Sequence, residues 1–136
     1  MDAKDTTLRI VDYKTGGSPK TPANIEQLFT PSETRPNYIF QTFLYAAIMS
    51  RQQSLKVAPS LLYIHRAASE SYSPVIEMGE PRQPKIPVSN FAFFEDEFRE
   101  RLQRLLEEIF DENEPFTQTE DTKKCAYCDF KAICKR

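Results

Sequence analysis

Glycine and histidine are scarce in this 136-residue chain, which has three glycines and one histidine. So few glycines exclude collagen-like and low-complexity chains. The chain also has no glycine-rich phosphate loop, no GxSxG sequence and no HExxH sequence. The commonest signatures of nucleotide-binding loops, serine hydrolases and zinc proteases are therefore missing.

Long apolar runs and a charge excess of one sign are missing as well. No run approaches the roughly 18 apolar residues of a membrane span, and the first residues lack the apolar segment of a signal peptide. We therefore expect a cytoplasmic protein with no membrane partner. Lys and Arg number 18 against 20 Asp and Glu, so the overall charge does not by itself indicate a nucleic-acid-binding protein. Any phosphate-binding surface must be local.

Three segments have the composition of β-strands. Residues 7–13 and 60–66 are rich in β-branched and apolar side chains, and residues 73–78 form a shorter segment of the same kind. Side chains alternate along a strand, so Asp12 shares a face with the apolar residues Leu8 and Ile10.

Two segments have helical periodicity. Apolar residues recur at helical spacing over residues 38–53, after a predicted N-cap at Asn37, and over residues 91–111. The second stripe is the stronger, and it consists of Phe94, Phe98, Leu102, Leu105, Leu106 and Ile109. The proline-containing segments 15–36 and 80–87 are predicted to be a long loop and a connector.

The order strand, helix, strand, strand, helix, tail predicts an α/β (α+β) fold with a small mixed sheet flanked by helices. We expect residues 1–121 to form the folded core and residues 122–136 to form a cysteine-bearing tail. The first strand begins within ten residues of the start, and three short strands make only a small sheet. We therefore expect the chain to be the C-terminal portion of a larger domain, truncated at its N-terminus.

The sharpest local motif is the sequence IVDYKTG at residues 10–16, where an apolar strand ends on polar residues. Alternation places Asp12 and Lys14 on the same face. A carboxylate there can hold a hard divalent cation, and the ammonium can neutralise charge that builds up on a phosphate. A solvated surface ion pair is the plainer interpretation of the same spacing.

A second pair lies on the first predicted helix. Gln41 and Tyr45 are four residues apart and share a helical face. Both side chains can form hydrogen bonds with phosphate or a base, and a tyrosine ring can stack on a base. The alternative interpretation is a surface glutamine beside a half-buried tyrosine.

All three cysteines lie near the end of the chain, at Cys125, Cys128 and Cys134. This spacing is typical of thiolates that hold zinc or an iron–sulfur cluster, although a fourth ligand is missing. Free thiols are the alternative. His65 is the single histidine, and its place in an apolar segment indicates a sheet residue more than a metal ligand.

Taken in order, the DYKTG sequence, the QxxxY pair and the CxxCxxxxxC tail resemble the RecB-like exonuclease branch of the PD-(D/E)XK nuclease superfamily. The resemblance covers residues 8–134. The cysteine tail is similar to that of AddB-type helicase–nucleases and CRISPR-associated RecB-like exonucleases. The resemblance implies a restriction-endonuclease-like core and a Mg²⁺- or Mn²⁺-dependent DNA exonuclease that acts in DNA repair or recombination, with a helicase domain or subunit as a partner.

The resemblance also implies roles for individual residues. Asp12 and the backbone carbonyl of Tyr13 would bind the metal ion, and Lys14 would position the attacking water or stabilise the pentavalent phosphate. Gln41 and Tyr45 would contact the DNA strand. The last three cysteines of an iron–sulfur cluster would be Cys125, Cys128 and Cys134.

Three features of the related enzymes are missing from this chain, one of which is an upstream helix with an acidic or His residue. The related enzymes also carry a further acidic ligand on the preceding strand, and Asp2 would match only a secondary residue of that stretch. The first cluster cysteine is absent too. We therefore expect this chain to be inactive by itself and to hold no intact iron–sulfur cluster, which would form only in a full-length parent protein.

Two other hypotheses remain open. One is a non-catalytic nucleic-acid-binding or scaffold domain that keeps the nuclease fold and has a structural cysteine tail. Its mark would be salt-sensitive DNA binding without metal-stimulated cleavage. The other is a zinc-binding protein–protein module, for which stoichiometric zinc without iron would be the evidence.

Overall fold

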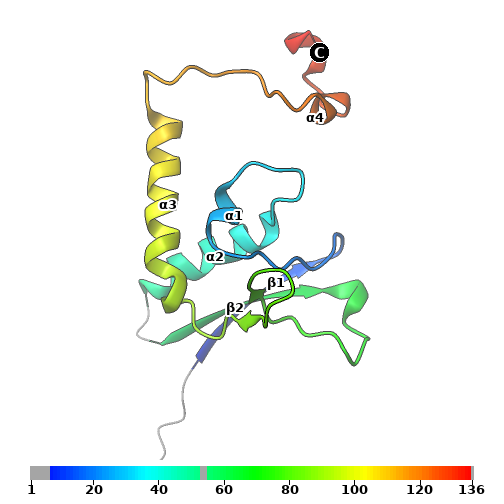
Figure 1. Cartoon of the computed structure of the whole chain (residues 1–136), viewed down its shortest axis with the longest axis vertical. Helices are drawn as coiled ribbons and strands as arrows, with labels where there is room; N and C mark the ends of the chain where they lie inside the picture. The colour runs from blue at the N-terminus through cyan, green and yellow to red at the C-terminus, as the bar shows by residue number, and fades with distance from the viewer. Residues whose placement is uncertain (1–6, 53–54, 136) are drawn as a thin grey trace, which may run out of the picture. The chain divides into compact units, whose positions relative to one another are not determined.

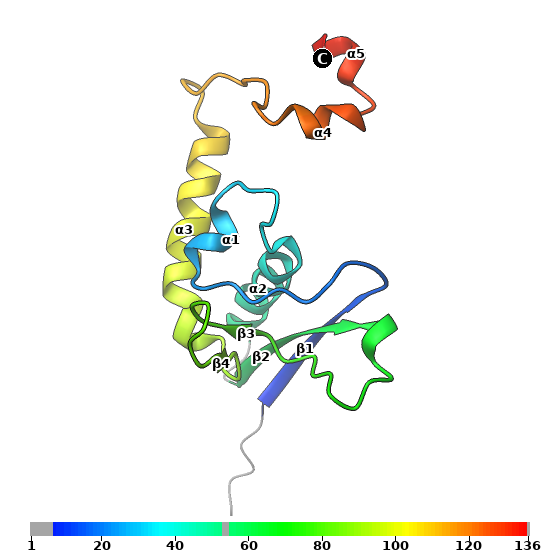
Figure 2. The ribbon, with the colours of Figure 1, turned by 45° about the vertical axis from the view of Figure 1, so that its right-hand side comes forward.

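The computed structural model describes residues 7–52 and 55–135. The chain divides into two compact units, Met1–Leu105 and Leu106–Arg136. The first unit has small sheets flanked by helices, as Figures 1 and 2 show. The predicted α/β class with a small mixed sheet is therefore confirmed. The predicted domain boundary at residue 121 stays a prediction.

Two parallel strands form the centre of the first unit. β1 (Thr7–Lys14) pairs with β2 (Lys56–Tyr63) along its whole length, from Thr7 opposite Lys56 to Lys14 opposite Tyr63. The prediction for β1 is confirmed with one added residue. The prediction of a strand at 60–66 was wrong at both ends. The ladder begins at Lys56, and it ends at Tyr63 because β1 ends at the paired residue Lys14. Residues Ile64–Arg66 instead form the short 3₁₀-helix η1.

The third predicted strand, residues 73–78, is mostly irregular. Pro74 has no N–H to donate to a ladder, although its carbonyl accepts a hydrogen bond of 2.8 Å from the N–H of Leu61. Only β3 (Glu77–Met78) is a strand, and it pairs with β4 (Ile86–Pro87) in antiparallel orientation. Residues 80–87, predicted to be only a connector, therefore end in a short strand.

Helix α2 (Asn37–Ser50) lies across one face of the β1–β2 pair (Figures 1 and 2). The predicted helix is confirmed but ends earlier, and residue 53 lies outside the described residues. The predicted N-cap is displaced by one position, because Pro36 occupies the cap and Asn37 is the first helical residue. The loop before α2 contains one further helix, α1 (Glu26–Phe29), which is anchored by the buried side chain of Leu28.

Aromatic side chains fill the space between α2 and the start of α3 (Ala92–Phe110). Phe43, Phe91 and Phe98 are fully buried, and their ring centroids are 5.3–5.9 Å apart. Such edge-to-face pairs add to the free energy gained from burying the rings. This cluster fixes α2 over the sheet.

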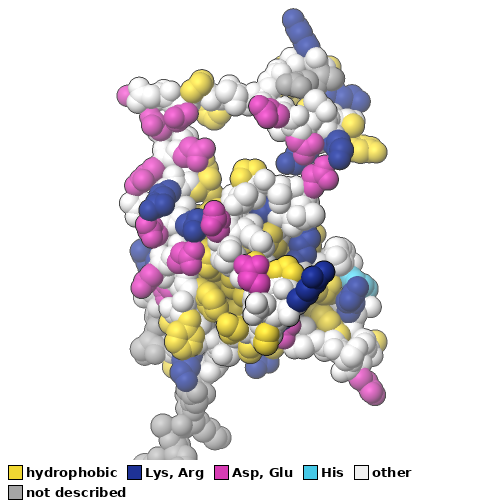
Figure 3. Space-filling model, viewed as in Figure 1, with side chains coloured by type: hydrophobic (Ala, Val, Ile, Leu, Met, Phe, Trp, Pro, Cys, Tyr) yellow, Lys and Arg dark blue, Asp and Glu magenta, His cyan; other side chains and the backbone are white. Residues whose placement is uncertain are grey.

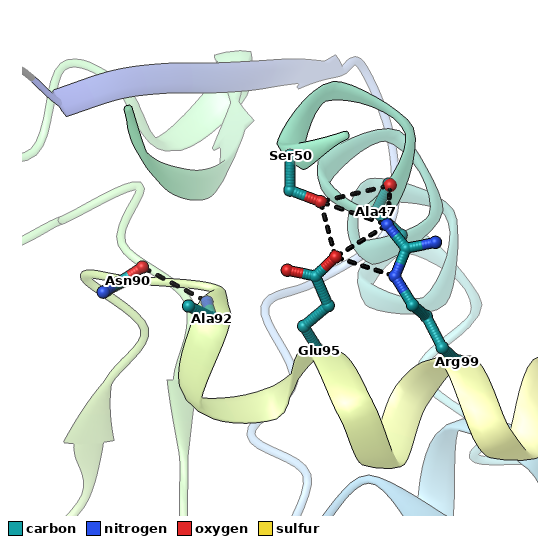
Figure 4. Close-up of polar contacts among 6 residues, drawn as sticks. All are labelled: Ala47, Ser50, Asn90, Ala92, Glu95 and Arg99. Atoms are coloured by element: carbon teal, nitrogen blue, oxygen red, sulfur yellow. Dashed lines mark hydrogen bonds and ion pairs between the residues drawn. The ribbon is translucent and has the colours of Figure 1, made fainter. Parts of the chain in front are cut away.

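A polar clamp connects the last turn of α2 with the first turns of α3 (Figure 4). Arg99 donates to the carbonyl of Ala47, and Ser50 Oγ donates to Glu95 Oε1 at 2.7 Å. Glu95 and Arg99 also form an ion pair at 2.6 Å. Arginine thereby satisfies a carbonyl that the end of a helix leaves unpaired.

The predicted apolar stripe of α3 is only half used for packing. Phe98 is buried and Leu102 packs against the core, but Leu106 and Ile109 are 45% and 54% exposed. Periodicity predicts the stripe but does not reveal where its packing partner ends.

The second unit consists of the end of α3 and two short helices, α4 (Thr122–Ala126) and α5 (Lys131–Cys134). Asp121 caps α4 by accepting a hydrogen bond of 3.2 Å from the N–H of Lys123. Within residues 106–135 every side chain is at least partly exposed. A search of the described residues found no helix long and apolar enough to cross a membrane.

Candidate active site

Asp12 and Lys14 lie together at the carboxyl end of β1, on the face that α2 covers. Lys14 Nζ is 2.9 Å from Asp12 Oδ2, and each side chain is 15% exposed. The alternation of the strand produces this pairing, as the sequence predicts. Such limited exposure distinguishes this ion pair from a freely solvated one.

Gln41 and Tyr45 extend this pair along α2. Lys14 Nζ donates to Gln41 Oε1 at 2.7 Å, and Gln41 Nε2 donates to Tyr45 Oη at 2.8 Å. The structure thus brings all four residues into one continuous chain of contacts, Asp12–Lys14–Gln41–Tyr45. The roles assigned to them by resemblance stay predictions.

Tyr38 belongs to the same cluster and was missed in the sequence analysis. Lys14 Nζ lies 4.5 Å from the centroid of its ring, within the range of a cation–π interaction. Tyr38 precedes Gln41 by three residues and Tyr45 by seven, so helical periodicity would have placed it on the same face. Gly17 makes room for the ring: its φ is +81°, and a Cβ there would lie 2.9 Å from Tyr38 Cε2.

Tyr63 lies beside this cluster, at the carboxyl end of β2. It pairs in register with Lys14, and its side chain is almost fully buried. Burial raises the pKa of the phenol, and the neighbouring Tyr72, Tyr38 and Asp12 raise it further. The phenol therefore stays neutral across the physiological range and adds no negative charge beside Asp12.

Asp12 is the one carboxylate of the contact chain. Its Oδ2 atom is buried and accepts no hydrogen bond from the residues that the structure describes, since its contact with Lys14 lacks hydrogen-bond geometry. An oxygen with a free lone pair suits a hard divalent cation such as Mg²⁺, which one or two carboxylates, waters and substrate phosphates usually hold. Within residues 7–52 and 55–135, no three His, Cys, Asp or Glu side chains gather closely enough to bind a metal ion. The donor chemistry of Asp12 therefore fits a Mg²⁺ ion, with the smallest number of carboxylate ligands that such an ion usually has.

Other predicted metal ligands stand apart from this cluster or remain untested. The backbone carbonyl of Tyr13 stays a predicted ligand, and Asp2 lies outside the described residues. The sequence predicts His65 to be a sheet residue, and this prediction was wrong. His65 lies exposed on η1, because the β-ladder ends at Tyr63.

The three cysteines of the second unit are free thiols and half-buried. Cys125 lies on α4, Cys128 follows that helix, and Cys134 is the last residue of α5. The thiol of Cys125 contacts the carbonyl of Asp121 at 3.9 Å. Their role in an iron–sulfur cluster stays a prediction.

Comparison with known families decides the identity of the fold. A family model described as the PD-(D/E)XK nuclease superfamily matches residues 1–135. The chain belongs to this superfamily. Searches of curated proteins and of solved structures found no match. Membership in the PD-(D/E)XK nuclease superfamily accounts for the restriction-endonuclease-like core and indicates a nuclease-like function, with DNA as the substrate and a divalent metal ion as the usual cofactor.

Proposed function

We propose that this chain carries part of the active site of a metal-dependent DNA exonuclease from the RecB-like branch of the superfamily, acting in DNA repair or recombination. The single observation that supports this proposal most strongly is the contact chain Asp12–Lys14–Gln41–Tyr45. It joins the acidic and basic residues of the DxK motif to both residues of the QxxxY motif, which begins 27 residues beyond Lys14.

Lys14 is the proposed electrostatic centre of the reaction. Its ammonium group is held by Asp12, by Gln41 and by the ring of Tyr38, so its position is fixed before substrate binds. A preorganised positive charge stabilises the negative charge that develops on a phosphate during hydrolysis, and it costs little reorganisation. Lys14 would also orient the attacking water. Asp12 keeps the ammonium group aimed at the phosphate.

A divalent metal ion, Mg²⁺ or Mn²⁺, would be held by Asp12 and the backbone carbonyl of Tyr13. When bound, such an ion lowers the pKa of a bound water and polarises the phosphoryl oxygen. Gln41 and Tyr45 would hold the DNA strand, since an amide and a phenol both bind phosphate oxygens. The Gln41–Tyr45 hydrogen bond sets the orientation of both groups.

The proposed metal site needs a second acidic ligand. Asp12 is the single carboxylate in the contact chain, and too few carboxylates give weak binding of hard cations. We infer that the missing ligand comes from residues beyond the described ones and that the 136-residue chain alone hydrolyses DNA poorly or not at all. By the same inference, Cys125, Cys128 and Cys134 complete an iron–sulfur cluster only in a full-length parent, which works with a helicase domain or subunit.

The test compares this chain with an extended protein that includes the residues encoded directly upstream of Met1. Degradation of single-stranded and duplex DNA is measured with and without Mg²⁺. We expect metal-dependent degradation by the extended protein and a loss of about 100-fold or more in its Lys14→Ala variant. Arg9→Ala is the matched control, because Arg9 is an exposed cation on the same strand. Unchanged activity in Lys14→Ala would contradict the proposed role.

A second candidate function follows from the small number of acidic ligands. A non-catalytic nucleic-acid-binding domain with the nuclease fold would need only the basic and hydrogen-bonding residues of the site. It would bind DNA in a salt-sensitive way, and the extended protein would show no metal-stimulated cleavage. The assay described above separates the two functions.

A further inference from the structure

Two hollows adjoin the candidate active site at the carboxyl ends of β1 and β2. The smaller has a volume of about 280 Å³ and is lined by Gly17, Arg35 and Tyr38 among others. The larger has a volume of about 500 Å³ and is lined by His65 and Arg66 among others. Both hollows share Lys20, Ile39 and Tyr63 as lining residues, so they are direct neighbours, and we call the two hollows together the edge groove.

Aromatic rings follow the edge groove from the active site outward. The Tyr38 and Tyr63 ring centroids are 6.4 Å apart, and those of Tyr63 and His65 are 6.1 Å apart. Tyr38 is 39% exposed and His65 is exposed, whereas Tyr63 is buried beneath them. The groove thus offers two accessible rings, and Tyr38 also contacts Lys14 of the candidate active site.

Positive charge accompanies these rings. Lys20, Arg35 and Arg66 line the groove, and Glu77 is the acidic residue that lines its larger hollow. Lys20 Nζ donates to the carbonyls of Thr34 and Arg35 at 2.9 and 3.2 Å, which ties the loop to the start of α2. Figure 3 shows dark-blue basic side chains beside the cyan histidine on this face.

We propose that the edge groove binds a single-stranded segment of DNA, with one end of the segment at Asp12 and Lys14. Proteins that hold single strands combine a cationic groove, which follows the backbone, with aromatic rings on which unpaired bases stack. Paired bases already stack within the duplex, so rings spaced along a groove favour an unpaired strand. The position of cleavage in this proposal rests on the proposed function, whereas strand binding by the groove does not.

The test is the binding of the 136-residue chain to a fluorescent thymidine oligonucleotide, followed by anisotropy in the presence of EDTA. His65→Ala removes a ring and Arg66→Ala removes a charge. Arg51→Ala is the matched control, because Arg51 is an exposed arginine at the opposite end of α2. We expect the His65→Ala variant to bind the oligonucleotide about tenfold more weakly. Arg66→Ala lowers the slope of log K against log salt by about 0.7, and Arg51→Ala changes neither quantity.

Several outcomes would overturn this proposal. They are wild-type affinity in both groove variants, an equal loss of affinity for duplex DNA, and displacement of the oligonucleotide by a polyglutamate peptide at similar concentration. Failure of the proposed function gives a different result. In that case the groove variants lose single-strand binding as expected, but Lys14→Ala does not reduce hydrolysis by the extended protein.

Discussion

The two regions of the molecule that carry sequence motifs differ in what positions their motif residues. Asp12 and Gln41 lie on an eight-residue strand and a fourteen-residue helix that pack over a common aromatic core. Cys125 and Cys134 lie on helices of five and four residues, in a unit where no described side chain is buried. A core therefore positions the first set of residues before any ligand binds, whereas no buried side chain of the second unit, as described, positions the cysteines.

Of the differences expected between the two regions, the largest is the loss of stability when a core side chain is removed. Phe98→Ala removes a fully buried ring that contacts Phe43 and Phe91, so we expect the free energy of unfolding to fall by about 3–5 kcal/mol. Phe116→Ala is the control in the second unit, where the ring is fully exposed, and it leaves that free energy unchanged. Urea unfolding measures both. Equal effects would show that the two regions do not differ as described.

A smaller effect concerns the contact between Lys14 and Gln41. The two side chains share a hydrogen bond of 2.7 Å, so a double-mutant cycle with Lys14→Ala and Gln41→Ala gives a coupling of about 0.5–3 kcal/mol in unfolding free energy. The control cycle pairs Lys14→Ala with Arg104→Ala on α3, where Arg104 is paired with Glu100. Additivity in the first cycle would mean that the contact between Lys14 and Gln41 adds nothing to stability.

A further prediction concerns the pH dependence of stability. Burial raises the pKa of Tyr63 in the folded protein, so folding favours the protonated phenol. The resulting stability is complete below the ordinary tyrosine pKa of about 10 and is lost as the pH rises beyond it. In the Tyr63→Phe variant, this contribution to the loss of stability at alkaline pH disappears. In the control variant Tyr127→Phe, in the second unit, the loss of stability at alkaline pH is the same as in the wild type. Thermal midpoints measured across this range test the prediction, and identical alkaline profiles for wild type and Tyr63→Phe would contradict it.

The smallest expected effect comes from the cysteines. No cysteine belongs to the core cluster, so we expect replacement of Cys125, Cys128 and Cys134 by serine to leave urea unfolding of the chain unchanged. Elemental analysis of the freshly purified chain should find no stoichiometric iron. A bound iron–sulfur cluster would show that three thiolates suffice, and stoichiometric zinc would favour the zinc-binding module instead.

Local periodicity was enough to predict the parts of the site that depend on one element. The period of a strand places Asp12 and Lys14 on one face, and the period of a helix does the same for Gln41 and Tyr45. The contact between Lys14 and Gln41 depends on how α2 crosses the sheet. That crossing is fixed by packing of residues far apart in the sequence, which no single-element pattern reveals.

The structure departs from the sequence pattern where a partner element ends. His65 has the neighbours of a strand residue, yet β1 offers no partner beyond Lys14 and the chain turns into η1. Leu106 and Ile109 continue the apolar stripe of α3 but remain exposed. Composition predicts which face favours burial, but only tertiary packing decides whether a neighbour covers it.

If Asp12 and Lys14 form a hydrolytic centre, they attract a divalent cation. Mn²⁺ is paramagnetic and suits carboxylate and carbonyl ligands. When the isotopically labelled chain is titrated with Mn²⁺, the NMR signals of amides near the bound ion broaden and thereby report where the ion binds. We expect early broadening at Asp12, Tyr13 and Lys14 and at the side-chain amide of Gln41, with loss of this pattern in Asp12→Asn. Broadening confined to the acidic helix α3 or to the cysteine tail, and unaffected by Asp12→Asn, would contradict this expectation.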